Sequence, residues 1–134
     1  MTPDNAPSAA SRKLIAALAV PPRVDALGPI GGRFVHALRL IAQYEQRGRD
    51  PVPELAARLG GVEFAARALL LAQAISASWP EAIHVSRFCC RLMSHDEATI
   101  GAFVDAAARG DRVGFEAALA GLVRPERMVR LWEA

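Results

Sequence analysis

Apolar residues recur every three or four positions along most of this chain, and that spacing is typical of amphipathic helices. The segment 33–46 shows the pattern clearly, because Phe34, Leu38 and Ile41 fall on one side of a helix. The other side of this segment is polar and carries His36, Arg39, Gln43 and Arg47. We therefore predict an amphipathic helix over these residues.

Prolines, glycines and capping residues divide the chain into six or seven short helices. Ser94 and Glu97 have the spacing of a capping box, and Pro53 and Pro125 suit the first turn of a helix. The segments 25–32 and 81–93 lack a clear period, so we expect loops there, with 83–86 as a short extended piece. The predicted helices span 11–20, 33–46, 53–59, 62–78, the residues after Ser94 to 108, 112–122 and the residues from 125 onward.

The predicted helix 62–78 is apolar almost all round. Its few polar positions are Glu63, Arg67, Gln73, Ser76 and Ser78. A helix without a broad polar face usually lies inside the core. The expected fold class is therefore all-α, a single compact bundle of six or seven short helices around this central apolar helix. We expect one helical domain over residues 11–134, preceded by a disordered tail, 1–10, that is rich in Pro and Ala.

The bulk composition agrees with one globular domain. The chain has 134 residues, of which 52% are apolar and 22% charged, and its net charge of +2 is too small to imply a polyanionic partner. No apolar run reaches the roughly 18 residues that span a bilayer. The segment 14–20 is short and is followed by two prolines, so we expect a helix there rather than a signal peptide. We expect no membrane association and a cytoplasmic protein with reduced thiols.

The segment 84–97 (HVSRFCCRLMSHDE) holds the most distinctive chemistry of the chain. Four side chains here could ligate zinc: His84, Cys89, Cys90 and His95. Structural zinc sites usually pair ligands two to four residues apart, and adjacent cysteines chelate one ion poorly because their side chains diverge. We therefore expect both cysteines to be small buried residues, with no metal and no other cofactor. The alternatives are a metal site and a redox-responsive thiol beside Arg87 and Arg91.

The segment IHVSRFCCRLMSHDEATI, which follows an Ala- and Leu-rich helix, resembles a family of small alphaproteobacterial helical proteins. That family's segment runs Cys-Cys-Cys, basic, Met, Ser or Thr, acidic. The matching residues here are Cys89, Cys90, Met93, Ser94, Asp96 and Glu97. Phe88 stands where the first cysteine would be, which argues against a three-thiolate metal site. The resemblance covers about residues 33–108 and implies a helical bacterial protein without a known activity.

The hairpin 53–78 has the apolar spacing of a helix-turn-helix motif, in which the second helix presents polar side chains to DNA bases. Here that helix offers Glu63, Arg67 and Gln73 among many Ala and Leu residues. The doubled glycine at 60–61 also adds a residue to the usual turn. A plain helical hairpin is therefore the favoured interpretation, and a DNA-binding regulator is an alternative.

A second candidate for contact with nucleic acid is the arginine series at the end of the chain. Arg124, Arg127 and Arg130 recur every three residues and could bind phosphate. Glu126 and Glu133 are interspersed with them, which favours a solvated face of mixed charge.

No catalytic signature is found along the chain: it has no phosphate-binding glycine loop, no paired histidines on a helix and no nucleophile elbow. The favoured hypothesis is a non-enzymatic, cytosolic bacterial adaptor or regulatory component that acts through protein–protein interaction, with a protein partner or as a homodimer. The candidates for an apolar contact surface are Trp79, Phe88, Met93 and Trp132.

Overall fold

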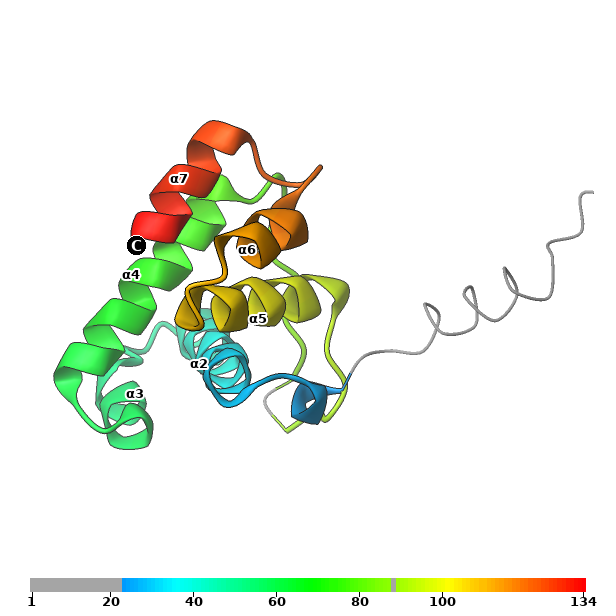
Figure 1. Cartoon of the computed structure of the whole chain (residues 1–134). Helices are drawn as coiled ribbons and strands as arrows, with labels where there is room; N and C mark the ends of the chain where they lie inside the picture. The colour runs from blue at the N-terminus through cyan, green and yellow to red at the C-terminus, as the bar shows by residue number, and fades with distance from the viewer. Residues whose placement is uncertain (1–22, 88) are drawn as a thin grey trace, which may run out of the picture.

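A computed structural model of the chain describes residues 23–87 and 89–134, and its described part is all-α, as predicted (Figure 1). It contains one short 3₁₀ helix and six α-helices packed together, with no strand in these two ranges. The predicted tail 1–10 and the predicted helix 11–20 lie outside the described residues. The elements are η1 (Val24–Ala26), α2 (Pro29–Gln46), α3 (Val52–Leu59), α4 (Val62–Ser78), α5 (His95–Ala108), α6 (Arg112–Leu119) and α7 (Pro125–Glu133).

Local signals predicted most helix boundaries. The capping box of α5 is present: Ser94 Oγ accepts the Glu97 N–H at 3.1 Å, and Glu97 Oε1 accepts the Ser94 N–H at 2.8 Å. Gly60 ends α3 with a φ of 90°, a left-handed conformation that suits glycine. Helix α6 is shorter than predicted, since it ends at Leu119 rather than at residue 122.

The start of α2 was predicted wrongly, because the helix begins at Pro29 within the expected loop 25–32. Its N-cap residue, Gly28, has no side chain that could accept the first N–H groups. The cap comes instead from α5, where the Asp105 carboxylate accepts the Gly28 N–H at 2.8 Å and the Gly31 N–H at 2.7 Å. A cap supplied from a distant helix leaves no local signal in the sequence.

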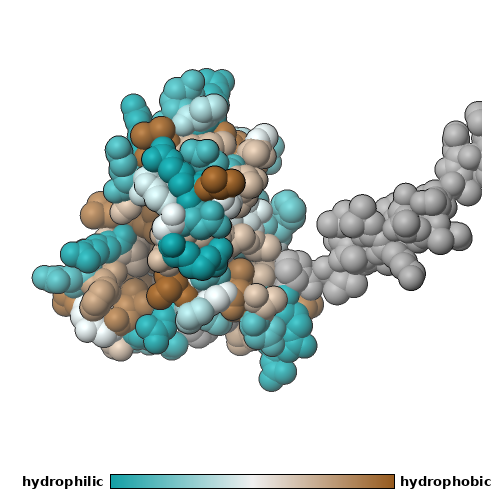
Figure 2. Space-filling model, viewed as in Figure 1, coloured by the Kyte–Doolittle hydropathy of each residue, from teal (hydrophilic) through white to brown (hydrophobic). Residues whose placement is uncertain are grey.

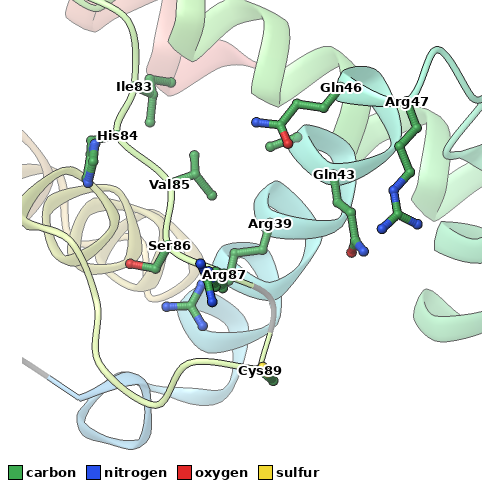
Figure 3. Close-up of a pocket in the computed structure, with 11 residues that line it drawn as sticks. Arg39, Gln43, Gln46, Arg47, Ile83, His84, Val85, Ser86, Arg87 and Cys89 are labelled. Atoms are coloured by element: carbon green, nitrogen blue, oxygen red, sulfur yellow. The ribbon is translucent and has the colours of Figure 1, made fainter.

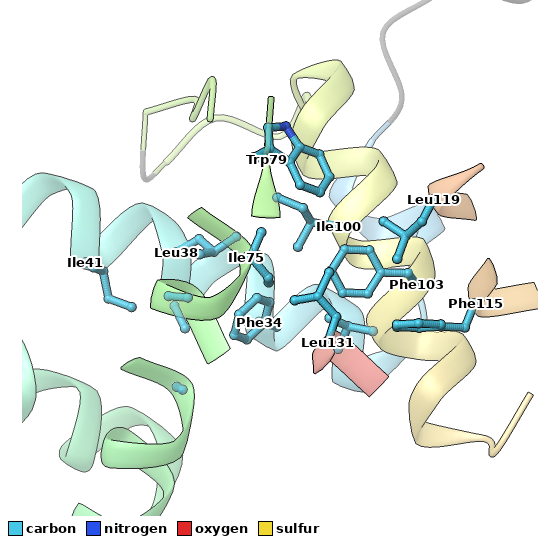
Figure 4. Packing of buried hydrophobic residues seen from close by; sticks show 14 of the residues in the cluster. Phe34, Leu38, Ile41, Ile75, Trp79, Ile100, Phe103, Phe115, Leu119 and Leu131 are labelled. Atoms are coloured by element: carbon cyan, nitrogen blue, oxygen red, sulfur yellow. The ribbon is translucent and has the colours of Figure 1, made fainter. Parts of the chain in front are cut away.

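The centre of the bundle is formed by α2 and α5, which pack against each other more extensively than any other pair of helices. Side chains from α2 and α5 meet those of the surrounding helices in one hydrophobic core (Figure 4). Phe103 of α5 packs edge-on against Phe115 of α6 at 5.5 Å between ring centroids, and Phe115 packs in the same way against Trp132 of α7 at 5.1 Å. Such aromatic pairs stabilise a core beyond the area they bury.

The prediction that helix 62–78 is enclosed at the centre is wrong. Helix α4 lies at the edge of the bundle, between α3 and α7 (Figure 1). It buries a narrow stripe consisting of Ala65, Ala68, Ala72, Ile75 and Ser78. Its outer side exposes large apolar side chains, with Phe64 53% and Leu70 64% accessible to solvent. A peripheral helix that exposes apolar side chains has the same sequence pattern as a helix that is buried on all sides.

The two central helices approach closely where α2 begins. A Cβ atom on Gly31 would collide with the Gly101 carbonyl oxygen and with the Asp105 carboxylate. The neighbouring Gly32 has no heavy atom nearer than the Val24 carbonyl oxygen, at 4.0 Å from such a Cβ atom. The two adjacent glycines therefore differ sharply in the space around them.

We expect Gly31→Ala to lower the free energy of unfolding by about 1–3 kcal/mol, because it forces α2 and α5 apart and disturbs the Asp105 cap. Gly32→Ala is the matched control and should be neutral or stabilising by up to about 1 kcal/mol, since alanine favours a helix over glycine. Urea denaturation followed by circular dichroism measures both. Equal effects of the two substitutions would show that the helices do not meet at Gly31.

Candidate functional site

A buried ion pair joins the two central helices. The Arg39 Nε atom of α2 lies 2.6 Å from Glu97 Oε2, and its Nη2 atom lies 3.1 Å from Glu97 Oε1. Both side chains are fully buried, at 0% exposure. Two parallel hydrogen bonds between a guanidinium and a carboxylate give a strong and directional contact. Arg39, which the sequence placed on the polar side of its helix, therefore faces the interior.

The same arginine holds the segment between α4 and α5, residues 79–94. Its Nη1 atom donates to the Cys90 carbonyl oxygen at 2.5 Å and its Nη2 atom to the Leu92 carbonyl oxygen at 2.9 Å. The described residues of this segment, 79–87 and 89–94, have no regular secondary structure apart from an isolated bridge between Leu92 and Arg23. The guanidinium thus satisfies backbone acceptors that a helix or strand would otherwise pair.

The start of α5 holds the middle of the segment. The Ser94 hydroxyl donates to the His84 carbonyl oxygen at 2.5 Å, and the Asp96 carboxylate accepts the His84 N–H at 2.8 Å. The expected extended piece 83–86 is irregular chain that is anchored at His84.

Hydrogen bonds keep Glu97 ionised. Burial would raise the pKa of its carboxyl, but hydrogen bonds from Arg39, the Ser94 N–H and Ser86, together with the charge of Arg39, lower the pKa below its ordinary value. A buried ion pair persists only when such additional hydrogen bonds offset the loss of hydration. Within the described residues, no buried side-chain nitrogen or oxygen lacks a hydrogen-bond partner.

The two cysteines do not pack in the interior, so that prediction is wrong. Cys89 is exposed and Cys90 is partly exposed, and both are free thiols. The hydrogen-bonded Cys90 carbonyl, rather than the thiol, faces Arg39. Across residues 23–87 and 89–134, no three His, Cys, Asp or Glu side chains come together as metal ligands, so His84 and His95 do not complete a site with the cysteines.

The residues expected to form an apolar contact surface differ in how exposed they are. Trp79 and Met93 are buried, at 6% and 5% exposure, so neither presents a surface to a partner. Trp132 is half-buried and packs on Phe115. Phe88 lies outside the described residues.

The hairpin of α3 and α4 has the predicted connection, and the polar side chains expected to face DNA on its second helix, Glu63, Arg67 and Gln73, are exposed. The first turn of α4 exposes Val62, Glu63 and Phe64. The arginines proposed for phosphate contact, Arg67, Arg124, Arg127 and Arg130, are all exposed. Arg67 lies on α4, whereas the other three lie at the N-cap of α7 or within it.

An apolar groove lies between α2 and α4, and sequence reasoning missed it. Hydrophobic side chains gather at the lower left of the face in Figure 2, over α3 and the first half of α4. The groove encloses about 360 Å³. We call it the α2–α4 groove, and its lining comprises Ile30, Arg33, Phe34, Ala37, Leu59, Phe64, Arg67, Ala68, Leu71, Val104 and Ala134.

The two long walls of the α2–α4 groove repeat one pattern. Helix α2 contributes Ile30, Arg33, Phe34 and Ala37, and α4 contributes Phe64, Arg67, Ala68 and Leu71. Both sets follow the spacing i, i+3, i+4, i+7, which places four side chains on one side of a helix. In each set the second residue is an exposed arginine, and neither arginine forms an ion pair with another described residue.

Comparisons of the chain with protein-family models, with curated proteins and with solved structures find no match. Among the helices of the described ranges, none is both long enough and apolar enough to cross a membrane.

We expect Arg39→Ala to lower the free energy of unfolding by roughly 3–5 kcal/mol, because it leaves the Glu97 charge buried without a partner and frees the Cys90 and Leu92 carbonyls. The control is Arg23→Ala, which removes an exposed pair with Asp25 and should cost less than about 1 kcal/mol. Chemical denaturation of both variants measures the difference. Similar losses in the two variants would contradict a special role for the buried pair.

The stability of the protein should fall at acidic pH through Glu97. Because the folded-state pKa of this carboxyl lies below its unfolded value of about 4.3, its contribution is complete above about pH 5 and is lost as the pH falls through the folded pKa. Glu97→Gln removes the titrating group and should make the decline in unfolding free energy below about pH 5 shallower than in the wild type. Glu133→Gln, at an exposed carboxyl, should leave the wild-type slope unchanged.

Proposed function

We propose that this protein is a non-enzymatic protein-interaction module that binds an amphipathic helix of a partner protein in the α2–α4 groove. The observation that carries the proposal is the pair of matching apolar stripes, one on α2 and one on α4, each with an arginine at the same place. Two neighbouring helices with such stripes form a surface against which a third helix can pack its apolar side.

Exposure of large side chains supports a docking surface here. Ile30 and Phe64 are about half exposed, on opposite walls of the groove. Burying half-exposed aromatic and aliphatic side chains of this kind is a favourable term in association. A contiguous apolar surface with a charged rim is typical of an interaction site.

The charge of the rim favours an acidic occupant. Arg33 and Arg67 flank the apolar stripes without ion pairs to other described residues, so carboxylates on a partner helix could pair with them. A second copy of this chain, docked symmetrically, would bring the same arginines together. The basic residues Arg12 and Lys13, before the apolar stretch 14–20, would likewise repel the rim. The charges therefore favour a different, acidic helix.

Binding of a partner helix would suit the bacterial regulatory or adaptor role that the sequence predicts. Reading of DNA bases by α4 is a weaker candidate, because Phe64, Leu71 and the acidic Glu63 occupy the part of α4 that would approach the duplex. The thiols of Cys89 and Cys90 lie in the segment after α4 rather than in the groove.

A fluorescein-labelled peptide of roughly 18 residues, five helical turns, tests the proposal. The peptide carries leucines at i, i+3, i+4 and i+7, glutamates beside them and alanines elsewhere. We expect saturable binding by fluorescence anisotropy, weakened about tenfold or more, or 1.4 kcal/mol, by Phe64→Glu and by Arg67→Glu. Val113→Glu is the matched control, since Val113 is 80% exposed on α6 and does not line the groove.

Four results would overturn the proposal. The first is equal affinity of Phe64→Glu, Arg67→Glu and Val113→Glu for the peptide. The second is equal or tighter binding of a peptide with lysines in place of the glutamates. The third is sedimentation of the wild type as a dimer that Phe64→Glu converts to a monomer, which would assign the groove to a second copy. Removal of residues 1–22 should leave the affinity unchanged, and a large gain would instead assign the groove to that segment.

A further inference from the structure

We infer that the protein has a second binding site, for a small oxyanion that bears carboxylate or phosphate groups. The site is a cavity of about 740 Å³ between the C-terminal half of α2 and residues 83–87 and 89 (Figure 3). We call it the oxyanion cavity. It shares no lining residue with the α2–α4 groove, so the inference stands apart from the proposed function.

The charges that line the oxyanion cavity are all of one sign. Its residues are Arg39, Ala42, Gln43, Gln46, Arg47, Ile83, His84, Val85, Ser86, Arg87 and Cys89, with no Asp or Glu among them. The charge of Arg39 is balanced by Glu97. Arg47 and Arg87 are exposed and form no ion pair with any other described residue, so two cations are available to a ligand.

The two arginines come from different walls. Arg47 is the C-cap residue of α2, and Arg87 lies on the irregular segment; both line the cavity, and in the view of Figure 3 Gln43 lies between them. A guanidinium group presents its N–H donors in a plane that matches the two oxygens of a carboxylate or phosphate. A ligand held between Arg47 and Arg87 would also meet the side-chain amides of Gln43 and Gln46, which can donate further hydrogen bonds.

Two points of the irregular wall, His84 and Cys90, are held in place before any ligand binds. His84 is tied through its N–H to Asp96 and through its carbonyl to Ser94, and the Cys90 carbonyl is tied to Arg39. The backbone on both sides of Arg87 is therefore anchored to α5 and α2. Anchor points that are fixed before binding reduce the conformational entropy lost on binding, which favours affinity.

The size and electrostatics of the cavity decide the ligand class. Its volume lies in the range of small-molecule sites. The C-terminus of α2 contributes a negative partial charge of about half an elementary charge, which two full positive charges outweigh. A multiply charged anion would use both arginines, whereas a cation would meet only repulsion. Tricarboxylates and polyphosphates share this chemistry, and separate titrations distinguish them.

Isothermal titration calorimetry with citrate in one arm and inorganic pyrophosphate in the other tests the inference. We expect saturable binding in at least one arm, weakened tenfold or more by Arg47→Gln and by Arg87→Gln, because each removes a charged hydrogen-bond donor. Arg130→Gln makes the same change of charge on α7, outside the cavity, and should alter the affinity less than twofold. Circular dichroism confirms that each variant is folded.

Cys89, which also lines the cavity, provides a second readout that does not depend on binding heat. In the Cys90→Ser variant, a saturating anion should slow the alkylation of Cys89 by N-ethylmaleimide severalfold, and Arg87→Gln should abolish this protection. The inference is wrong if neither anion binds below about 10 mM, or if all three arginine variants lose affinity equally. It is also wrong if the bound anion leaves the alkylation rate unchanged.

Discussion

One buried ion pair determines how the centre of this protein is assembled. Glu97 serves two structures at once, because it closes the capping box of α5 and neutralises Arg39 of α2. Arg39 in turn binds the backbone of the segment that leads into α5. A charge pair without exposure to water is tolerated only when nearly every donor and acceptor finds a partner. The relative placement of α2, α5 and residues 79–94 is therefore strongly constrained.

Both candidate sites depend on α2, which this pair fixes against α5. The first turns of α2 supply Ile30, Arg33 and Phe34 to the α2–α4 groove, and its last turns supply Gln43 and Arg47 to the oxyanion cavity. Apolar side chains dominate the first site, and polar and cationic ones the second. One helix thus supports two surfaces of different chemistry, at opposite ends and on different sides.

The sequence predicted the elements well where local interactions define them. The capping box at Ser94, the proline at the start of α7 and the glycine turn after α3 each act within a few residues, and each is present in the structure. The candidate sites were harder to predict. The sequence identified Phe64 and Leu71 only as apolar residues of a helix and not as part of a groove. Periodicity does not reveal which apolar side of a helix stays exposed. Cys89 was expected inside because a free cysteine is usually buried, yet it is exposed.

By itself, the sequence determined an all-α protein and most of its helix boundaries, because helical periodicity, caps and breakers are local properties of the chain. Only the tertiary structure decided burial. Arg39 and Glu97 are 58 residues apart, and Asp105 caps a helix that begins 76 residues before it. Such pairings depend on how helices meet in space, and a polar residue looks the same in sequence whether it faces water or a distant partner.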